Sequence, residues 1–259
     1  MKHLSLVLLA LIGLSNSGFS QDYCLTVESA DASVVADATT YRFYVNSADA
    51  TDKISAVFGN DLAAWEVNAP DGIFNSPMSV TWNASGVNPA FLPAFPDLAD
   101  DSYATIGLEG PASTSGIMGA ADPSIVEDED QPVSPFFQTD GATELLSNSE
   151  IGSAVYVLNT AANALPDADG RWLVMQITTT GEISGQVNYL VFPLGEGAND
   201  ILVSTSFDGA GTYFGTQIFE VLGCMQPEAC NYDPCANLEP VDPNNPDSCN
   251  YPDANGNCN

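Results

Sequence analysis

Two short acidic motifs carry the most specific chemical hypothesis in this sequence. Asp167-Ala168-Asp169-Gly170 and Asp253-Ala254-Asn255-Gly256-Asn257 share the form Asp-x-(Asp/Asn)-Gly. Turns that cluster carboxylate and amide oxygens offer the hard ligands that Ca²⁺ prefers. The candidate metal ligands are therefore Asp167, Asp169, Asp253, Asn255 and Asn257. Neither motif has the complete ligand set of an EF-hand loop, and both also fit ordinary hairpin turns, so the two interpretations stay open.

Histidine is absent after position 3, which removes the usual general base from most hydrolases. Lys53 could serve a Ser-Lys pair, but Asp49 and Asp52 beside it favour a surface charge partner. Paired carboxylates can hydrolyse glycosides. With 34 acidic residues, however, the existence of some pair discriminates nothing. We expect no catalytic residue, and a carbohydrate-active enzyme using two Asp or Glu side chains is the alternative.

Aromatic and sulfur-containing side chains give two further sets of candidates. Indole rings can stack on sugars or fill a core, so the tryptophans are candidates for glycan contact with core packing as the competing interpretation. The even number of cysteines predicts three disulfides in an oxidising compartment, with the connectivity left open; the spacings fit no zinc site. The tryptophans are Trp65, Trp82 and Trp172, and the cysteines are Cys24, Cys224, Cys230, Cys235, Cys249 and Cys258.

The N-terminal 20 residues have the pattern of a secretory signal peptide. Lys2 and His3 precede an apolar run over 4–14, and Gly18 and Ser20 suit a signal peptidase. The run is shorter than the roughly 20 residues that span a bilayer, and no later segment is long enough. We expect cleavage after Ser20 and a protein that is secreted, extracellular or at the cell surface, or else periplasmic.

The formal net charge of −30 restricts the partners. Nucleic-acid binding depends on Lys and Arg that neutralise phosphates, and anionic membranes attract basic segments. After signal removal only Arg42, Lys53 and Arg171 would be cationic. We therefore expect no nucleic-acid partner, no transmembrane segment, and a protein or glycan surface as the ligand.

Strands are the elements that must position these residues, because apolar residues alternate with period 2. The pattern predicts a hairpin of 172–178 and 183–192, with Gly181 at positive φ in its turn. A short helical turn is expected near 61–65. The Pro-rich segment 70–135 should be ordered loop or edge structure packed on the sandwich. Its acidic run 127–130 should be a solvated turn, with a divalent-cation site as the alternative. The other expected strands are 41–46, 54–58, 102–108, 154–158, 201–207 and 216–221.

The segment from Gly223 to Pro234 reads Gly-Cys-Met-Gln-Pro-Glu-Ala-Cys-Asn-Tyr-Asp-Pro. It resembles the Gly-Cys-x5-Cys-Asn-Tyr-(Asp/Asn)-Pro repeat of secreted and surface proteins of marine Bacteroidetes. Segments 41–46, 55–60 and 183–188 resemble an uncharacterised secreted domain that accompanies such repeats. The resemblance implies an extracellular address and a modular architecture, and it carries no established reaction. Cys235 is additional to the usual repeat, and no sorting domain follows in this sequence, so we do not expect type IX export of the chain as given.

These patterns together predict an all-β protein. Residues 1–20 are expected to be the signal peptide, 21–222 a β-sandwich of Ig-like or jelly-roll type, and 223–259 a small disulfide-rich module. The expected function is that of a secreted non-catalytic surface or matrix protein acting as an adhesion or binding module. The alternatives are the carboxylate-based enzyme and a plain structural spacer. The sequence specifies no definite cofactor, and Ca²⁺ is the one that it suggests.

Overall fold

The structure, a computed structural model, describes residues 23–218, 224, 226–230 and 249. The regular elements among these residues are strands and short 3-10 helices, and loops and turns connect them. The strands are β1 (Cys24–Asp31), β2 (Thr39–Asn46), β3 (Lys53–Gly59), β4 (Trp65–Asn68), β5 (Tyr103–Ala104), β6 (Ser124–Val126), β7 (Glu144–Ser147), β8 (Ser153–Tyr156), β9 (Arg171–Thr179), β10 (Ser184–Phe192), β11 (Ile201–Asp208), β12 (Gly211–Phe214) and β13 (Thr216–Ile218). The 3-10 helices are η1 (Ala84–Gly86), η2 (Pro96–Asp100), η3 (Ala112–Thr114), η4 (Phe136–Gln138), η5 (Ala162–Ala164) and η6 (Pro193–Gly195).

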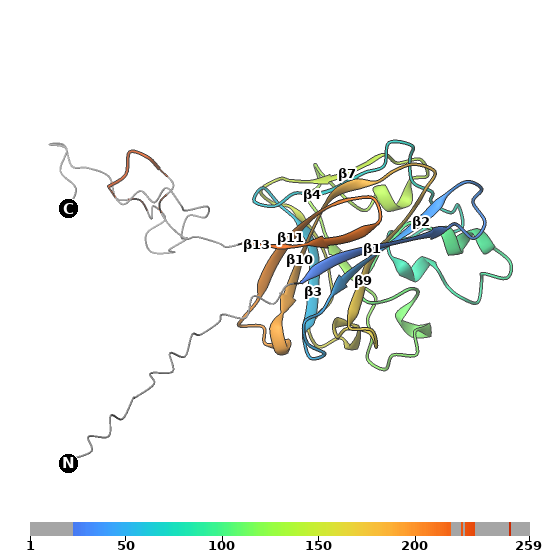
Figure 1. The fold of residues 1–259 in the computed structure, drawn as a ribbon, viewed down its shortest axis with the longest axis horizontal. Helices are drawn as coiled ribbons and strands as arrows, with labels where there is room; N and C mark the ends of the chain where they lie inside the picture. Colours follow the sequence, from blue (N-terminus) through green and yellow to red (C-terminus); the bar gives the residue numbers. More distant parts are fainter. Residues whose placement is uncertain (1–22, 219–223, 225, 231–248, 250–259) are drawn as a thin grey trace, which may run out of the picture.

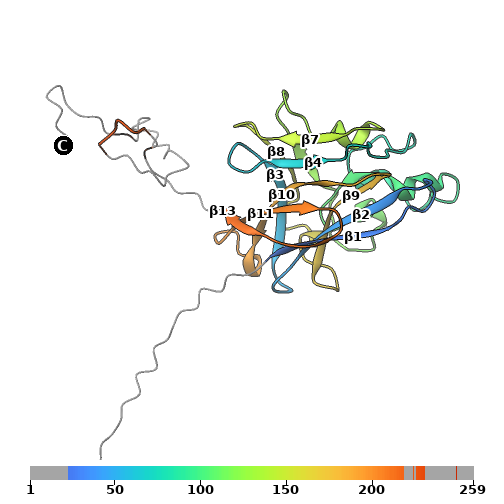
Figure 2. The ribbon, with the colours of Figure 1, turned by 45° about the horizontal axis from the view of Figure 1, so that its top comes forward.

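Two antiparallel sheets pack face to face (Figures 1 and 2). Sheet A has the order β12-β1-β2-β9-β5. Sheet B has the order β13-β11-β10-β3-β8-β6, and β4 pairs with both β10 and β7. One large apolar cluster fills the space between the sheets, with Phe43 of sheet A meeting Phe207 of sheet B edge to face at 5.0 Å. The expected all-β sandwich is confirmed.

The predicted central hairpin is wrong, although both of its strands exist. β9 pairs with β2 and β5 in sheet A, whereas β10 pairs with β11, β3 and β4 in sheet B. The connection between them therefore crosses from one sheet to the other. Gly181 is not at positive φ either. A Cβ there would lie 2.3 Å from a carboxylate oxygen of Asp71, so this glycine allows a close approach and not a tight turn.

The helical turn expected near 61–65 is also absent, since these residues form bends that lead into β4. β3 and β4 pair with successive parts of β10, and residues 60–64 leave the sheet between them. The amide of the fully buried Asn188 donates to the carbonyl oxygens of Phe58 and Ala63 at 3.0 and 2.9 Å. Backbone groups freed by the break are thereby satisfied by a side chain from β10.

The Pro-rich segment 70–135 is ordered, and part of it packs on the outer face of sheet A, whereas its β6 forms an edge of sheet B. A second apolar cluster joins Tyr44 and Leu173 of the sheet to Ala84, Val87 and Tyr103 of this segment. Only β5 forms a strand where we expected 102–108, although the N–H groups of Thr105 and Gly107 still donate to the carbonyl oxygens of Val174 and Leu173 in β9 at 2.9 and 2.8 Å. Sheet A is therefore covered on both faces over part of its area.

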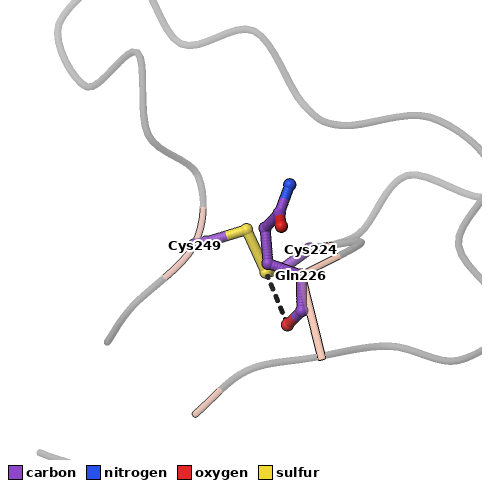
Figure 3. Close-up of a disulfide and its surroundings, with 3 residues drawn as sticks. All are labelled: Cys224, Gln226 and Cys249. Atoms are coloured by element: carbon purple, nitrogen blue, oxygen red, sulfur yellow. Dashed lines mark hydrogen bonds between the residues drawn. A yellow bond between two sulfur atoms is a disulfide. The ribbon is translucent and has the colours of Figure 1, made fainter. Parts of the chain in front are cut away.

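A disulfide joins Cys224 to Cys249 in the C-terminal region (Figure 3). The Sγ of Cys224 lies 3.9 Å from the carbonyl oxygen of Gln226. These two cysteines and Ala229 form a small buried cluster, and Cys230 is disulfide-bonded as well. The expected disulfide-bonded C-terminal region is confirmed. Within the described part of the chain, no helix has the length and apolar character needed to cross a membrane.

Residues 211–218 link the two sheets at one edge. β12 pairs with β1 in sheet A, and β13 pairs with β11 in sheet B, so the chain changes sheets at Gly215. A Cβ on Gly215 would lie 2.3 Å from Cγ1 of Val203 and 3.0 Å from the carbonyl oxygen of Tyr23. The corner therefore depends on the absence of a side chain at this position.

We expect Gly215→Ala to lower the free energy of unfolding by about 1–3 kcal/mol, because the added methyl overpacks a closed corner. Gly197→Ala is the matched control, since its Cβ would meet only the Asn159 amide at an ordinary 3.7 Å. Chemical denaturation of both variants measures the difference. Equal stability of the two variants would show that the corner relaxes freely and does not constrain the sandwich.

Candidate functional site

A polar row crosses the outer face of sheet A on four adjacent strands. The strand register places Glu28 of β1 opposite Arg42 of β2, Arg42 opposite Gln176 of β9, and Gln176 opposite Tyr103 of β5. Side chains at directly paired positions share one face of a sheet. Arg42 belongs to this row and pairs with Glu109, and Arg171 contacts the row through Glu28. These are two of the three cations expected in the mature chain.

Gln176 holds the row together. It is 1% exposed, and its Oε1 accepts from Arg42 Nε at 3.0 Å and from the Tyr103 hydroxyl at 3.4 Å. Its Nε2 donates to the carbonyl oxygens of Ala99 and Asp101 at 3.1 and 2.8 Å. Both ends of the amide are thus committed, so the Arg42 side chain is fixed through its Nε.

The two arginines meet at Tyr44. The guanidinium of Arg171 lies over the Tyr44 ring, 3.9 Å from its centroid, and donates to Glu28. Burial acts to lower the pKa of Arg171, but the hydrogen bond and charge of Glu28 outweigh it and the pKa rises. Burial raises the pKa of Tyr44 above its usual value, against the opposing hydrogen bond with Arg42. Because both pKa values are raised, Arg171 stays cationic and Tyr44 stays neutral at neutral pH.

Two adjoining cavities open on this face. The larger has a volume of about 470 Å³ and lies between the polar row and residues 87–117. The smaller, of about 230 Å³, lies beside β1, and both cavities are lined by Arg42 and Ala99. Glu109 reaches the larger cavity, with its Oε1 3.7 Å from Nη1 of Arg42. Val87, Leu92 and Ile117 supply apolar walls.

Two buried carboxyl groups hold the covering segment in place. Asp100 accepts from the N–H groups of Ser33, Val34 and Val35 at 2.6, 2.6 and 2.9 Å, which ties the segment to the β1–β2 turn. Asp101 is fully buried and accepts from the N–H of Ser76 at 2.8 Å. Burial raises the pKa of Asp101 to about 6, although the Ser76 hydrogen bond acts in the opposite direction.

Two of the three tryptophans that were candidates for glycan contact are fully buried. Trp65 and Trp172 are each 0% exposed, and the indole N–H of Trp172 donates to the carbonyl oxygen of Ala164 at 2.8 Å. Trp82 is half-buried and packs against the main core. The competing interpretation of core packing therefore applies to Trp65 and Trp172, because no sugar can reach a fully enclosed ring.

The first acidic motif forms a turn before β9. Oδ1 of Asp167 accepts from the N–H groups of Asp169 and Arg171, each at 2.9 Å, and Gly170 has a φ of +76°. These contacts are those of a hydrogen-bonded turn. Among the residues that the structure describes, no three His, Cys, Asp or Glu side chains gather as a metal site would require. Asp253, Asn255 and Asn257 lie outside the described residues.

The acidic run at 127–130 and Lys53 are both engaged locally. Glu127 accepts from the N–H groups of Val133 and Ser134, each at 2.9 Å, so it organises a turn, but Asp128 is buried and not solvated as we expected. Lys53 Nζ donates to the carbonyl oxygen of Asn159 at 2.6 Å, and the ion pairs within the described residues involve only arginines. The expectation of a charge partner for Lys53 is wrong, because its side chain reaches a backbone acceptor.

Of the candidate cysteines, Cys24 lies in β1, and Cys235 and Cys258 lie outside the described residues. Sequence reasoning did not select the residues of the cavity. Alternation along 41–46 could have placed Arg42 and Tyr44 opposite the core face, and a glutamine inside the apolar run 172–177 marks a buried polar contact. The position of Glu109 has no such signal, since it depends on how a long loop folds back.

No protein-family model matches this chain, and no curated protein or solved structure matches it either.

We expect Gln176→Met to lower the free energy of unfolding by about 2–3 kcal/mol, because it leaves the carbonyl oxygens of Ala99 and Asp101 without the hydrogen-bond donor that they have in the wild type. Gln217→Met is the matched control, since Gln217 is exposed on β13. Thermal unfolding of both variants checks the expectation. A Gln176→Met protein as stable as the control would mean that the row does not fasten the loop to the sheet.

We expect Asp101→Asn to stabilise the fold at neutral pH and to matter little near pH 4. A carboxyl whose folded pKa is about 6, against an ordinary 3.8, binds protons more tightly when folded. The contribution of Asp101 to wild-type stability therefore falls as pH rises from about 4 to 6, by at most about 3 kcal/mol. Urea denaturation at several pH values measures this difference. Asp61→Asn, at an exposed acid, should leave the wild-type pH profile unchanged, and identical profiles for the two variants would contradict the account.

Proposed function

We propose that this protein is a secreted, non-catalytic surface or matrix protein that acts as an adhesion or binding module through the outer face of sheet A. The observation that carries the proposal is the cavity of about 470 Å³ whose polar side is fixed in place by Gln176. Binding sites are typically concave, largely preformed, and lined by apolar groups with a few oriented polar ones. This cavity has each of these properties.

The distribution of carboxyl groups supports binding over hydrolysis. Glycosidases place two carboxyl groups about 5–10 Å apart across the scissile bond. Glu109 is the only carboxylate among the described residues that line the larger cavity. In the smaller cavity Glu28 pairs with Arg171, Asp100 accepts from three backbone N–H groups, and Asp31 is the third carboxyl group of the lining. Glu28 and Asp100 are thus engaged in holding the structure together.

The proposed location is outside the cell. The signal-peptide pattern of residues 1–20 and the resemblance of the C-terminal segment to surface-protein repeats both support export. The Cys224–Cys249 disulfide is of the kind that persists in oxidising compartments. The proposed ligand is a component of a cell or matrix surface, either a protein or a glycan.

A combined binding and turnover screen tests this function. The mature protein is applied to a glycan array and to immobilised matrix and cell-surface preparations, and the bound glycans are then analysed for cleavage products. The screen is run with and without calcium, and we expect saturable binding to at least one surface, without turnover. Multiple-turnover cleavage would contradict the non-catalytic role, and uniform failure to bind would leave the structural spacer as the better description.

A further inference from the structure

We infer that the larger cavity binds the end of an uncharged glycan, with sugar hydroxyls bridging Arg42 and Glu109. The inference rests on the proposed function and narrows its ligand to one chemical class. It follows from the donors and acceptors that face the cavity, from the charge of the site and its surroundings, and from the character of the cavity walls.

The Arg42–Glu109 pair offers both kinds of hydrogen-bonding group to a ligand. Its Nη1–Oε1 distance of 3.7 Å is longer than a direct hydrogen bond, and the two side chains are 39% and 65% exposed. A guanidinium only donates, and a carboxylate only accepts. A hydroxyl does both, so neighbouring hydroxyls of one sugar ring can accept from Arg42 and donate to Glu109. A ligand that only accepts would leave the carboxylate unsatisfied.

The charges around the cavity favour a neutral ligand. Glu109 would repel an anion at short range, and the formal net charge of −30 opposes its approach at long range. A cation would meet the fixed guanidinium of Arg42. A neutral polyhydroxyl compound avoids both costs, and it exchanges hydrogen bonds to water for hydrogen bonds to charged groups, which are stronger than those between neutral groups.

The walls of the cavity suit a sugar ring. Leu92 and Ile117 line the cavity with partly exposed side chains and can cover the C–H surface of a pyranose. The volume of about 470 Å³ lies within the range of about 300–1,000 Å³ typical of small-molecule sites, which allows a short saccharide end. Because Gln176 is buried and fully hydrogen-bonded, Arg42 is already oriented, and little ordering entropy is lost on binding.

The test is a glycan array that carries neutral, sulfated and uronic-acid glycans, followed by calorimetry with the neutral oligosaccharide that gives the strongest signal. We expect neutral glycans to bind wild-type protein. Glu109→Ala and Arg42→Met should each weaken that binding by about tenfold or more, since each removes a charge-assisted hydrogen bond. Glu150→Ala, at an exposed acid away from the cavity, is the matched control and should bind as wild type does. Thermal melting of each variant verifies that it is folded.

The outcomes separate this inference from the proposed function. Preferential binding of sulfated or uronic-acid glycans, tightened by Glu109→Ala, would overturn the assignment of a neutral ligand and leave a binding module. A silent array would overturn the sugar assignment as well. If wild type and Glu109→Ala then bind equally to an immobilised protein or cell surface, the adhesion function stands with a different site. Neutral-glycan binding unaffected by either cavity variant would place the sugar elsewhere.

Discussion

The hydrogen bonds of Gln176 are the contacts on which the outer face of sheet A depends. A buried amide in the middle of β9 must find partners for both of its ends, or it destabilises the strand. It finds them in Arg42 on the neighbouring strand and in the carbonyls of Ala99 and Asp101 on the covering segment. One side chain thus fastens the long loop to the sheet and orients the guanidinium beside the cavity. Fold and site are linked through this residue.

The distribution of charge is consistent with this arrangement. Thirty-four acidic residues against four cations make self-repulsion a general feature of the chain. Several of the acidic side chains accept hydrogen bonds from nearby backbone N–H groups, as Asp100 and Asp167 do. The arginines instead gather where β1, β2 and β9 meet, with Tyr44 between them. Positive charge is scarce in this protein, and its concentration on one face distinguishes that face from the rest of the described surface.

Local patterns in the sequence predicted the strands better than they predicted the strands' partners. Alternation identified 41–46, 172–178, 183–192 and 201–207 correctly, because period 2 follows from the geometry of a single strand. The predicted hairpin failed because the short link after β9 connects different sheets, and pairing is decided by the whole core. Gln176 was visible as a polar interruption. Glu109 was not, since its contact with Arg42 spans 67 positions and depends on the fold of a loop that has no periodic signal.

Binding without chemistry, at a preformed donor and acceptor pair, is the central claim of this account. A crystal structure of the mature protein with its best-binding oligosaccharide tests it most directly. The account predicts an intact saccharide whose hydroxyls contact Arg42 and Glu109, beneath the walls formed by Leu92 and Ile117, with Gln176 in its present position. A cleaved glycosidic bond, or a saccharide bound on sheet B, would contradict it.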